Sequence, residues 1–241
     1  MNDMTDGHTV KSFNSDMNRL HQLVLRISEL ARNQITDAVQ CLEDEDISLA
    51  REVISKDQEI NALDVKADEE VIRIIAKRQP MARDLREIMT INKIVADIER
   101  VGDLARRVAR LTLHFYDGNN NPPNSHLLSD IPKIAAYADL MLEKAVRAFD
   151  ELDPELALEV IKMDADLNEE FRSSLRRRST SLMEDARSVG HVTDVVLGLR
   201  SLERIGSHAK NIARYVVFLV KGKDVRHESL EVVSAEVLDK G

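Results

Sequence analysis

Two stretches of this chain repeat each other: Glu99-Arg-Val-Gly-Asp103-Leu-Ala-Arg-Arg-Val-Ala109-Arg110 and Glu203-Arg-Ile-Gly-Ser207-His-Ala-Lys-Asn-Ile-Ala213-Arg214. Copies that begin at residues 99 and 203 are too far apart for a short solenoid unit, so they indicate a duplicated domain. The first copy places the carboxylates of Glu99 and Asp103 one helical turn apart, on one face of a helix. In the second copy Ser207 stands where Asp103 stands in the first.

The duplication extends upstream of these stretches. Residues 46–61 and 153–168 share half of their positions, including a common Val-Ile-x-x-Asp that ends at Asp57 and Asp164. Apolar residues recur at helical spacing through both halves and predict six long helices. We expect these helices over about residues 16–43, 47–78, 82–115, 132–149 and 154–186, and from just after a break at Gly190 to Lys221.

A run of turn-forming residues, Asp117-Gly-Asn-Asn-Asn-Pro-Pro-Asn-Ser125, separates the two halves. Because the other connections are short, each half is predicted to be an antiparallel three-helix bundle. The predicted fold class is therefore all-α, an elongated tandem duplication of a three-helix bundle with six long helices. The predicted parts are a first bundle (16–116), a linker (117–130), a second bundle (131–227) and an acidic, poorly packed C-terminal tail (228–241).

The composition narrows the classes of function. Charged residues make up 32% of the 241 residues and the net charge is −9, which disfavours nucleic acid or a lipid surface as a partner. The N-terminal residues lack the apolar core of a secretory signal, and no apolar stretch is long enough for a membrane span. Cys41 is the single cysteine, so no internal disulfide is expected. These features predict a cytoplasmic protein.

The motifs of several enzyme classes are absent from the sequence. It contains no glycine-rich phosphate loop, no Cys-x-x-Cys, no His-Glu-x-x-His and no Glu-x-x-His of the ferritin-like di-iron proteins. No side chain stands out as a general base. We therefore expect no catalytic residues and a protein that is not an enzyme.

Acidic side chains nevertheless form a pattern. Four polar residues of the second predicted helix follow one another at helical spacing and form a narrow stripe. They are Asp57, Asn61, Asp64 and Asp68. Glu99 and Asp103 flank the apolar stripe of the next helix, so the two sets of side chains can face each other. Clustered carboxylates repel unless protons, arginines or a cation compensate, and oxygen ligands suit magnesium, manganese or iron. In a second interpretation the acids are solvated and pair with arginines such as Arg100 and Arg106.

These features resemble the PhoU family of phosphate-transport regulators, over residues from about 15 to 230. The resemblance rests on the doubled Glu-Arg-x-Gly signature, on the Val-Ile-x-x-Asp before each copy, and on four further stretches. They are Val71-Ile-Arg-Ile-Ile-Ala-Lys-Arg-Gln-Pro80, Asp84-Leu-Arg86, Met183-Glu-Asp185 and Val220-Lys-Gly-Lys-Asp-Val-Arg-His227.

The resemblance implies a cytoplasmic protein of two three-helix bundles that is commonly a homodimer. It implies a negative regulator of phosphate uptake and of the phosphate-starvation genes. Such a regulator acts by contact with the phosphate ABC transporter, at its ATPase subunit, and with a sensor histidine kinase, and it meets the membrane only through these partners. A carboxylate-ligated metalloenzyme and a metal-free helical adaptor are the alternatives.

The resemblance also implies multinuclear metal clusters held by pairs of Glu/Asp-x-x-x-Asp motifs. Carried over to this chain, the ligands of the first half are Glu99, Asp103, Asp57, Asp64 and Asp68. Those that remain in the second half are Glu203, Asp164 and Asn168. Ser207 and Asn168 each stand where the family has an acid, so the second site is expected to bind metal weakly or not at all. The implied metal is iron, manganese, magnesium or zinc.

Overall fold

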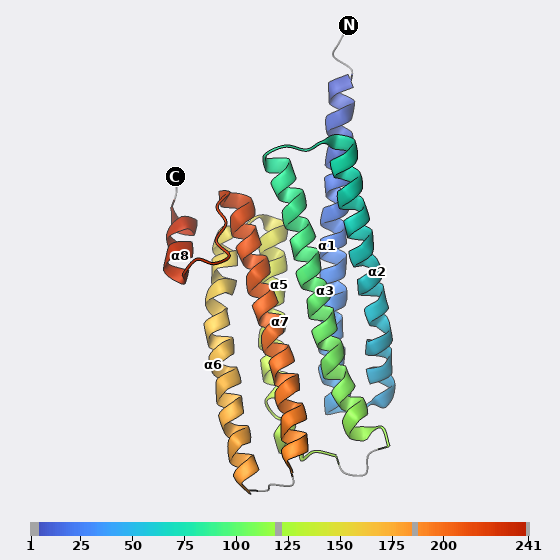
Figure 1. Ribbon diagram of the computed structural model, residues 1–241, viewed down its shortest axis with the longest axis vertical. Helices are drawn as coiled ribbons and strands as arrows, with labels where there is room; N and C mark the ends of the chain where they lie inside the picture. Colours follow the sequence, from blue (N-terminus) through green and yellow to red (C-terminus); the bar gives the residue numbers. More distant parts are fainter. Residues whose placement is uncertain (1–4, 119–121, 185–187, 240–241) are drawn as a thin grey trace.

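The computed structural model describes residues 5–118, 122–184 and 188–239. Three long helices form the first half: α1 (Thr5–Glu43), α2 (Ile47–Arg78) and α3 (Arg83–Tyr116). The second half begins with the short α4 (Ser125–Leu128) and continues with α5 (Ile131–Glu151), α6 (Pro154–Glu184), α7 (Val189–Lys221) and α8 (Leu230–Leu238). The described residues contain no strand, so the predicted all-α class is confirmed. Figure 1 shows α1, α2, α3, α5, α6 and α7 lying along the long axis of an elongated molecule.

The long helices begin and end where the capping residues place them. The side chain of Asp46 accepts a hydrogen bond from the backbone N–H of Leu49 at 2.9 Å, and Asp153 caps the start of α6 in the same way. Gly222 ends α7 with a φ of 79°, a left-handed conformation that costs glycine little. The predicted helix boundaries at these residues are confirmed.

The prediction of a break at Gly190 is wrong, because α7 begins at Val189 and Gly190 lies in its first turn. A glycine in a first helical turn costs some stability but does not stop the helix. The end of the preceding helix, predicted at about residue 186, lies outside the described residues; α6 is described as far as Glu184.

The prediction of a poorly packed tail after residue 227 is also wrong. Residues 230–238 form α8, whose Val233 and Val237 are buried, and α8 packs on α6 and α7. The Arg214 guanidinium donates hydrogen bonds to the carbonyls of Arg226 and Glu228 and so holds the chain that leads to α8. The two valines are one turn apart and share a face, and the prediction gave too much weight to the acids of a segment that is mostly apolar.

The two bundles pack against each other along their length. α3 lies beside α7 and α1 beside α5, and the buried apolar residues of both halves form one continuous core. The Arg32 guanidinium on α1 donates hydrogen bonds to Asp139 and Glu143 on α5, each at 2.9 Å. No helix among the described residues is long and apolar enough to cross a membrane.

Candidate metal centre

The first-half candidates gather where α2 packs on α3. Asp57 is buried, and the side chains of Glu99 and Asp103 are exposed by only about a fifth. Between them lies Gly102, where an added Cβ would stand 3.0 Å from Oε1 of Gln34 and 3.5 Å from Oδ1 of Asp57. Both of these oxygen atoms are buried and have no hydrogen-bond donor in the described part of the chain. Gly102 therefore lets these two unpaired oxygen atoms, together with Cδ1 of Ile60, approach the backbone of α3 closely.

The acids of this cluster repel one another. Burial raises the pKa of Glu99, and the negative charges of Asp103, Asp64 and Asp57 raise it further. The pKa of Asp64 is raised by burial and then by the charge of Asp68. A cluster whose members favour protonation is one that a cation would stabilise.

A basic side chain compensates part of this charge in the structure. Nη1 of Arg106 lies 3.0 Å from Oδ2 of Asp57, and its Nη2 lies 2.5 Å from Oδ1 of Asp103. Arg106 therefore bridges α2 and α3 through the two aspartates. Nε of Arg100 lies 3.5 Å from Oε2 of Glu99. The contacts of Arg106 and Arg100 therefore agree with the interpretation in which arginines pair with the acids.

The remaining first-half candidates lie further along α2. Asp64 is half-buried, whereas Asp68 is exposed. Asn61 is exposed as well, and its amide lies 3.4 Å from Oδ2 of Asp57. Asp57 and Asp64 therefore lie near Glu99 and Asp103 of α3, whereas Asp68 lies at the edge of the cluster.

The second-half candidates are also paired with basic side chains. Glu203 is buried, accepts a hydrogen bond from Ser207 at 3.4 Å and lies 2.9 Å from Nη1 of Arg200, although its Oε2 has no hydrogen-bond donor among the described residues. Oδ2 of Asp164 lies 2.5 Å from Nζ of Lys210, although its Oδ1 has no donor among the described residues. Hence Lys210 pairs with the α6 aspartate as Arg106 pairs with the α2 aspartate.

The surroundings of the repeated glycine differ in the second half. The amide of Asn168 donates to the backbone carbonyl of Asp164 at 2.7 Å, so its NH₂ group serves its own helix. A Cβ on Gly206 would overlap Cδ2 of Leu167 and would lie 3.2 Å from the sulfur of Met141. Only Leu167 and Met141 therefore face the second glycine, whereas oxygen atoms of Gln34 and Asp57 face the first beside Cδ1 of Ile60.

The donor set of the first half fits a hard or intermediate cation. As the side chains stand, no three His, Cys, Asp or Glu residues of the described ranges come together as metal ligands. In the first half, the carboxylates of Asp57 and Asp103 are paired with Arg106. The unpaired oxygens beside Gly102 and the raised pKa of Glu99 supply ligand atoms and unbalanced charge.

Sequence reasoning missed Gln34 and Lys210. Gln34 comes from α1, and nothing in its local sequence indicates that its Oε1 faces Gly102. Lys210 had a signal, because a basic residue follows the alanine in both copies of the repeat, at Arg106 and Lys210. The recurrence of a basic residue at the same position in both copies indicated that this residue contacts the acids.

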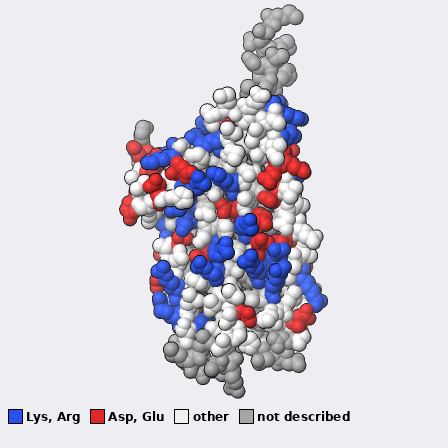
Figure 2. Space-filling view, in the orientation of Figure 1, with Lys and Arg blue, Asp and Glu red and all other residues white. Residues whose placement is uncertain are grey.

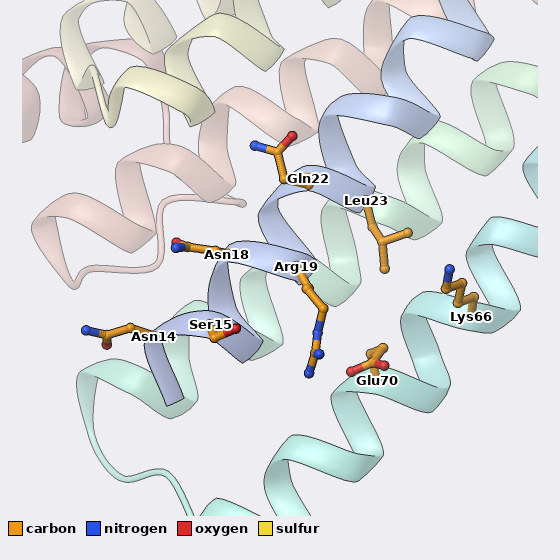
Figure 3. Close-up of a pocket in the computed structure, with 8 residues that line it drawn as sticks. All are labelled: Asn14, Ser15, Asn18, Arg19, Gln22, Leu23, Lys66 and Glu70. Atoms are coloured by element: carbon orange, nitrogen blue, oxygen red, sulfur yellow. The ribbon is translucent and has the colours of Figure 1, made fainter. Parts of the chain in front are cut away.

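A separate cavity of about 580 Å³ lies between the N-terminal part of α1 and the α2 helix. Figure 3 shows Arg19 of α1 extending toward Glu70 of α2, with Lys66 further along α2. The neighbouring Asp16 is buried and accepts hydrogen bonds from Arg73 at 2.8 Å and Arg78 at 3.0 Å. No candidate metal ligand lines this cavity, so it is distinct from the acidic cluster.

The fold and the acidic cluster together define a class: duplicated helical bundles with carboxylates between their second and third helices. Residues 24–112 and 131–216 match the PhoU domain. The chain belongs to the PhoU family.

Named relatives match over nearly the whole chain. The phosphate-specific transport system accessory protein PhoU homolog of Pseudomonas aeruginosa is 38% identical over 235 residues, which cover 98% of this chain and 96% of the relative. The phosphate-specific transport system accessory protein PhoU of Escherichia coli K12 is 33% identical over 233 residues, which cover 97% of this chain and 93% of the relative.

Solved structures agree with this assignment. The crystal structure of PhoU from Pseudomonas aeruginosa superposes with a TM-score of 0.83 at 38% identity, covering 88% of this chain and 100% of that one. The phosphate transport system regulatory protein PhoU from Streptococcus pneumoniae has a TM-score of 0.78 at 23% identity, covering 88% of this chain and 99% of that one. The latter likeness shows the fold alone.

Neutralising the acid pair is expected to stabilise the metal-free protein. The folded-state pKa of Glu99 lies above its ordinary value of 4.5, so folding takes up a proton in the interval between the two values. The free energy of unfolding therefore falls as pH rises through that interval and stays low above it. In Glu99→Gln/Asp103→Asn protein this fall disappears, and the variant gains stability over wild type as pH rises. Urea denaturation of chelator-treated protein at several pH values measures the difference.

The control for this prediction is Asp117→Asn, an exposed carboxylate remote from the cluster. It removes a charge without relieving the repulsion at Glu99, so its stability difference from wild type should not depend on pH in this way. An acid-pair variant that is less stable than wild type near neutral pH would contradict the prediction.

Proposed function

We propose that this chain is an accessory protein of a phosphate-specific transport system and a negative regulator of phosphate uptake and of the phosphate-starvation genes. The observation that carries the proposal is the match to the PhoU domain in both halves, with relatives of that name aligned over nearly the full chain. The protein acts in the cytoplasm by contact with other proteins and is not an enzyme. Its partners are the ATPase subunit of the phosphate transporter and a sensor histidine kinase, and it reaches the membrane only through them. It works as a homodimer.

A bound metal is part of this proposal, and it belongs to the first half. Glu99, Asp103, Asp57 and Asp64 would hold it, with Asp68 at the edge of the cluster. Bound iron, manganese, magnesium or zinc supplies positive charge that offsets the repulsion among these carboxylates.

The residues around the cluster govern how it accepts a cation. Arg106 pairs with Asp57 and Asp103 in the structure and has to release them, so it competes with the metal for the same oxygen atoms. Gln34 adds a neutral oxygen beside Gly102. In the second half Glu203 and Asp164 are already paired, and the weak donors Asn168 and Ser207 complete the set. A resident metal there is therefore not part of the proposal.

Deleting the gene tests the regulatory role. In cells without this protein, a reporter driven by a phosphate-starvation promoter is expected to be active even when phosphate is plentiful. Expression of the wild-type chain should silence the reporter again, whereas an empty vector should not. A reporter that stays silent in the deletion strain at high phosphate would refute negative regulation.

A further inference from the structure

The seam between the two bundles contains a hollow that no part of the proposed metal chemistry uses. It has a volume of about 410 Å³ and lies between α3 and α7. The residues that line it include three arginines and three leucines, and we call it the arginine groove. They are Leu104, Arg107, Leu111, Leu197, Arg200 and Arg204.

The floor of the arginine groove is apolar. Leu104 is buried and Leu111 is partly buried, whereas Leu197 is 60% exposed at the edge. Gly198 belongs to the lining, and a Cβ there would lie only 2.5 Å from Cδ1 of Leu111, so this glycine lets α7 come close to α3. A large exposed leucine beside an apolar floor is typical of a surface that binds a partner.

The rim of the groove carries uncommitted positive charge. Arg107 and Arg204 are exposed, and neither has an ion pair or hydrogen bond with any residue in the described part of the chain. Arg200 is partly committed, because it pairs with Glu203 at 2.9 Å and lies over the ring of Phe171. Figure 2 shows Lys and Arg side chains gathered over the middle of the face that α3 and α7 form. In a chain of net charge −9, this is a local patch of opposite sign.

We propose that the arginine groove docks an acidic segment of a partner protein, with carboxylates on Arg107 and Arg204 and an apolar side chain over the leucine floor. Charge complementarity identifies the occupant, since planar guanidinium groups pair with carboxylates through two parallel hydrogen bonds. A concave groove admits a protein segment, whereas a flat lipid surface would meet only its rim. The inference rests on the proposed function, because regulation by contact requires such a surface.

Binding of the purified full-length chain to the solubilised transporter and to the kinase, by biolayer interferometry, tests this. We expect the Arg107→Glu/Arg204→Glu variant to bind at least one of these two partners with an affinity reduced by about tenfold or more. Wild-type affinity for that partner should fall between about 50 and about 300 mM NaCl. The matched control, Arg83→Glu/Arg172→Glu, makes the same charge change at exposed arginines outside the groove and should retain wild-type affinity. Circular dichroism checks that each variant is folded. If the Arg107→Glu/Arg204→Glu variant is not folded, partner binding by Leu197→Ser tests the groove instead.

The outcomes separate the two proposals. Undiminished binding of both partners by the Arg107→Glu/Arg204→Glu or the Leu197→Ser variant overturns the groove and leaves the proposed function standing. A wild-type chain that binds neither partner overturns the proposed function and the groove with it. Binding to phosphatidylglycerol vesicles that the double reversal abolishes, with partner binding intact, assigns the groove to a lipid surface and overturns the protein-docking proposal.

Discussion

Replacing Asp130 with alanine is expected to lower the free energy of unfolding by about 3–5 kcal/mol, the usual result of orphaning a buried charge. Asp130 lies between α4 and α5, and Oδ2 of its carboxylate lies 2.9 Å from Nη2 of Arg178, which is 1% exposed. Its carboxylate also accepts hydrogen bonds from Ser174 at 2.9 Å and Arg177 at 3.1 Å. Without Asp130 the guanidinium of Arg178 stays buried with no counter-charge from the part of the chain that the structure describes. Such a loss lowers the melting temperature by roughly 6–20 °C in a chain of this size.

Two controls accompany the Asp130 prediction. Asp117→Ala breaks an exposed pair with Arg51 and should cost less than about 1 kcal/mol. Asp130→Ala/Arg178→Leu removes both buried charges and should recover much of the lost stability. A single Asp130→Ala variant as stable as Asp117→Ala would contradict the account of this ion pair.

The Asp130 pair also predicts a pH dependence. Burial alone would raise the pKa of Asp130, but hydrogen bonds from Arg177 and Ser174 and the charge of Arg178 outweigh it and hold the pKa below 3.8. The stabilisation is therefore fully present above 3.8 and is lost as pH falls through the lowered folded pKa. The stability difference between wild type and Asp130→Ala should accordingly shrink in acid.

The proposed metal site predicts that neutralising the acid pair removes most of the metal bound by the purified chain. Glu99→Gln/Asp103→Asn takes away two charged ligands from the half in which unpaired oxygens of Gln34 and Asp57 face Gly102. A carboxamide is a neutral and weaker ligand, so the cation loses both charge compensation and coordination. Elemental analysis of protein purified from iron- and manganese-rich medium measures the effect, expressed as metal per chain.

The matched control for this measurement is Glu203→Gln in the second half. Its carboxylate already pairs with Arg200 and Ser207, so its neutralisation should leave the metal content nearly unchanged. Unchanged metal in the Glu99→Gln/Asp103→Asn protein would show that the first half is not the main site. Metal lost only in the Glu203→Gln protein would move the site to the second half.

The helices were predictable because their apolar periodicity is strong. Leu20, Val24, Ile27 and Ala31 follow one another at helical spacing in the sequence, and all four are fully buried in α1. The caps at Asp46 and Asp153 have a local mechanism that the sequence displays directly. The short α8 was missed although most of its residues are apolar, because nine residues are too few for helical periodicity to stand out.

The candidate site was predictable only in part, since its partners come from different helices. Spacing along α3 placed Glu99 and Asp103 on one face, and spacing along α2 did the same for its aspartates. Spacing within a helix does not tell how two helices are rotated against each other. Hence the bridge from Arg106 to Asp57 and the approach of Gln34 to Gly102 became visible only in the structure.

Capture of partners from cells grown at high and at low phosphate tests the central claim, regulation by contact, most directly. The tagged full-length chain is expected to recover the ATPase subunit of the phosphate transporter and the sensor histidine kinase, and a tag-only control should recover neither. Quantitative mass spectrometry of the captured proteins measures the enrichment. Recovery of both partners in at least one condition is the predicted result. Failure to enrich either partner over the control under both conditions would contradict the account.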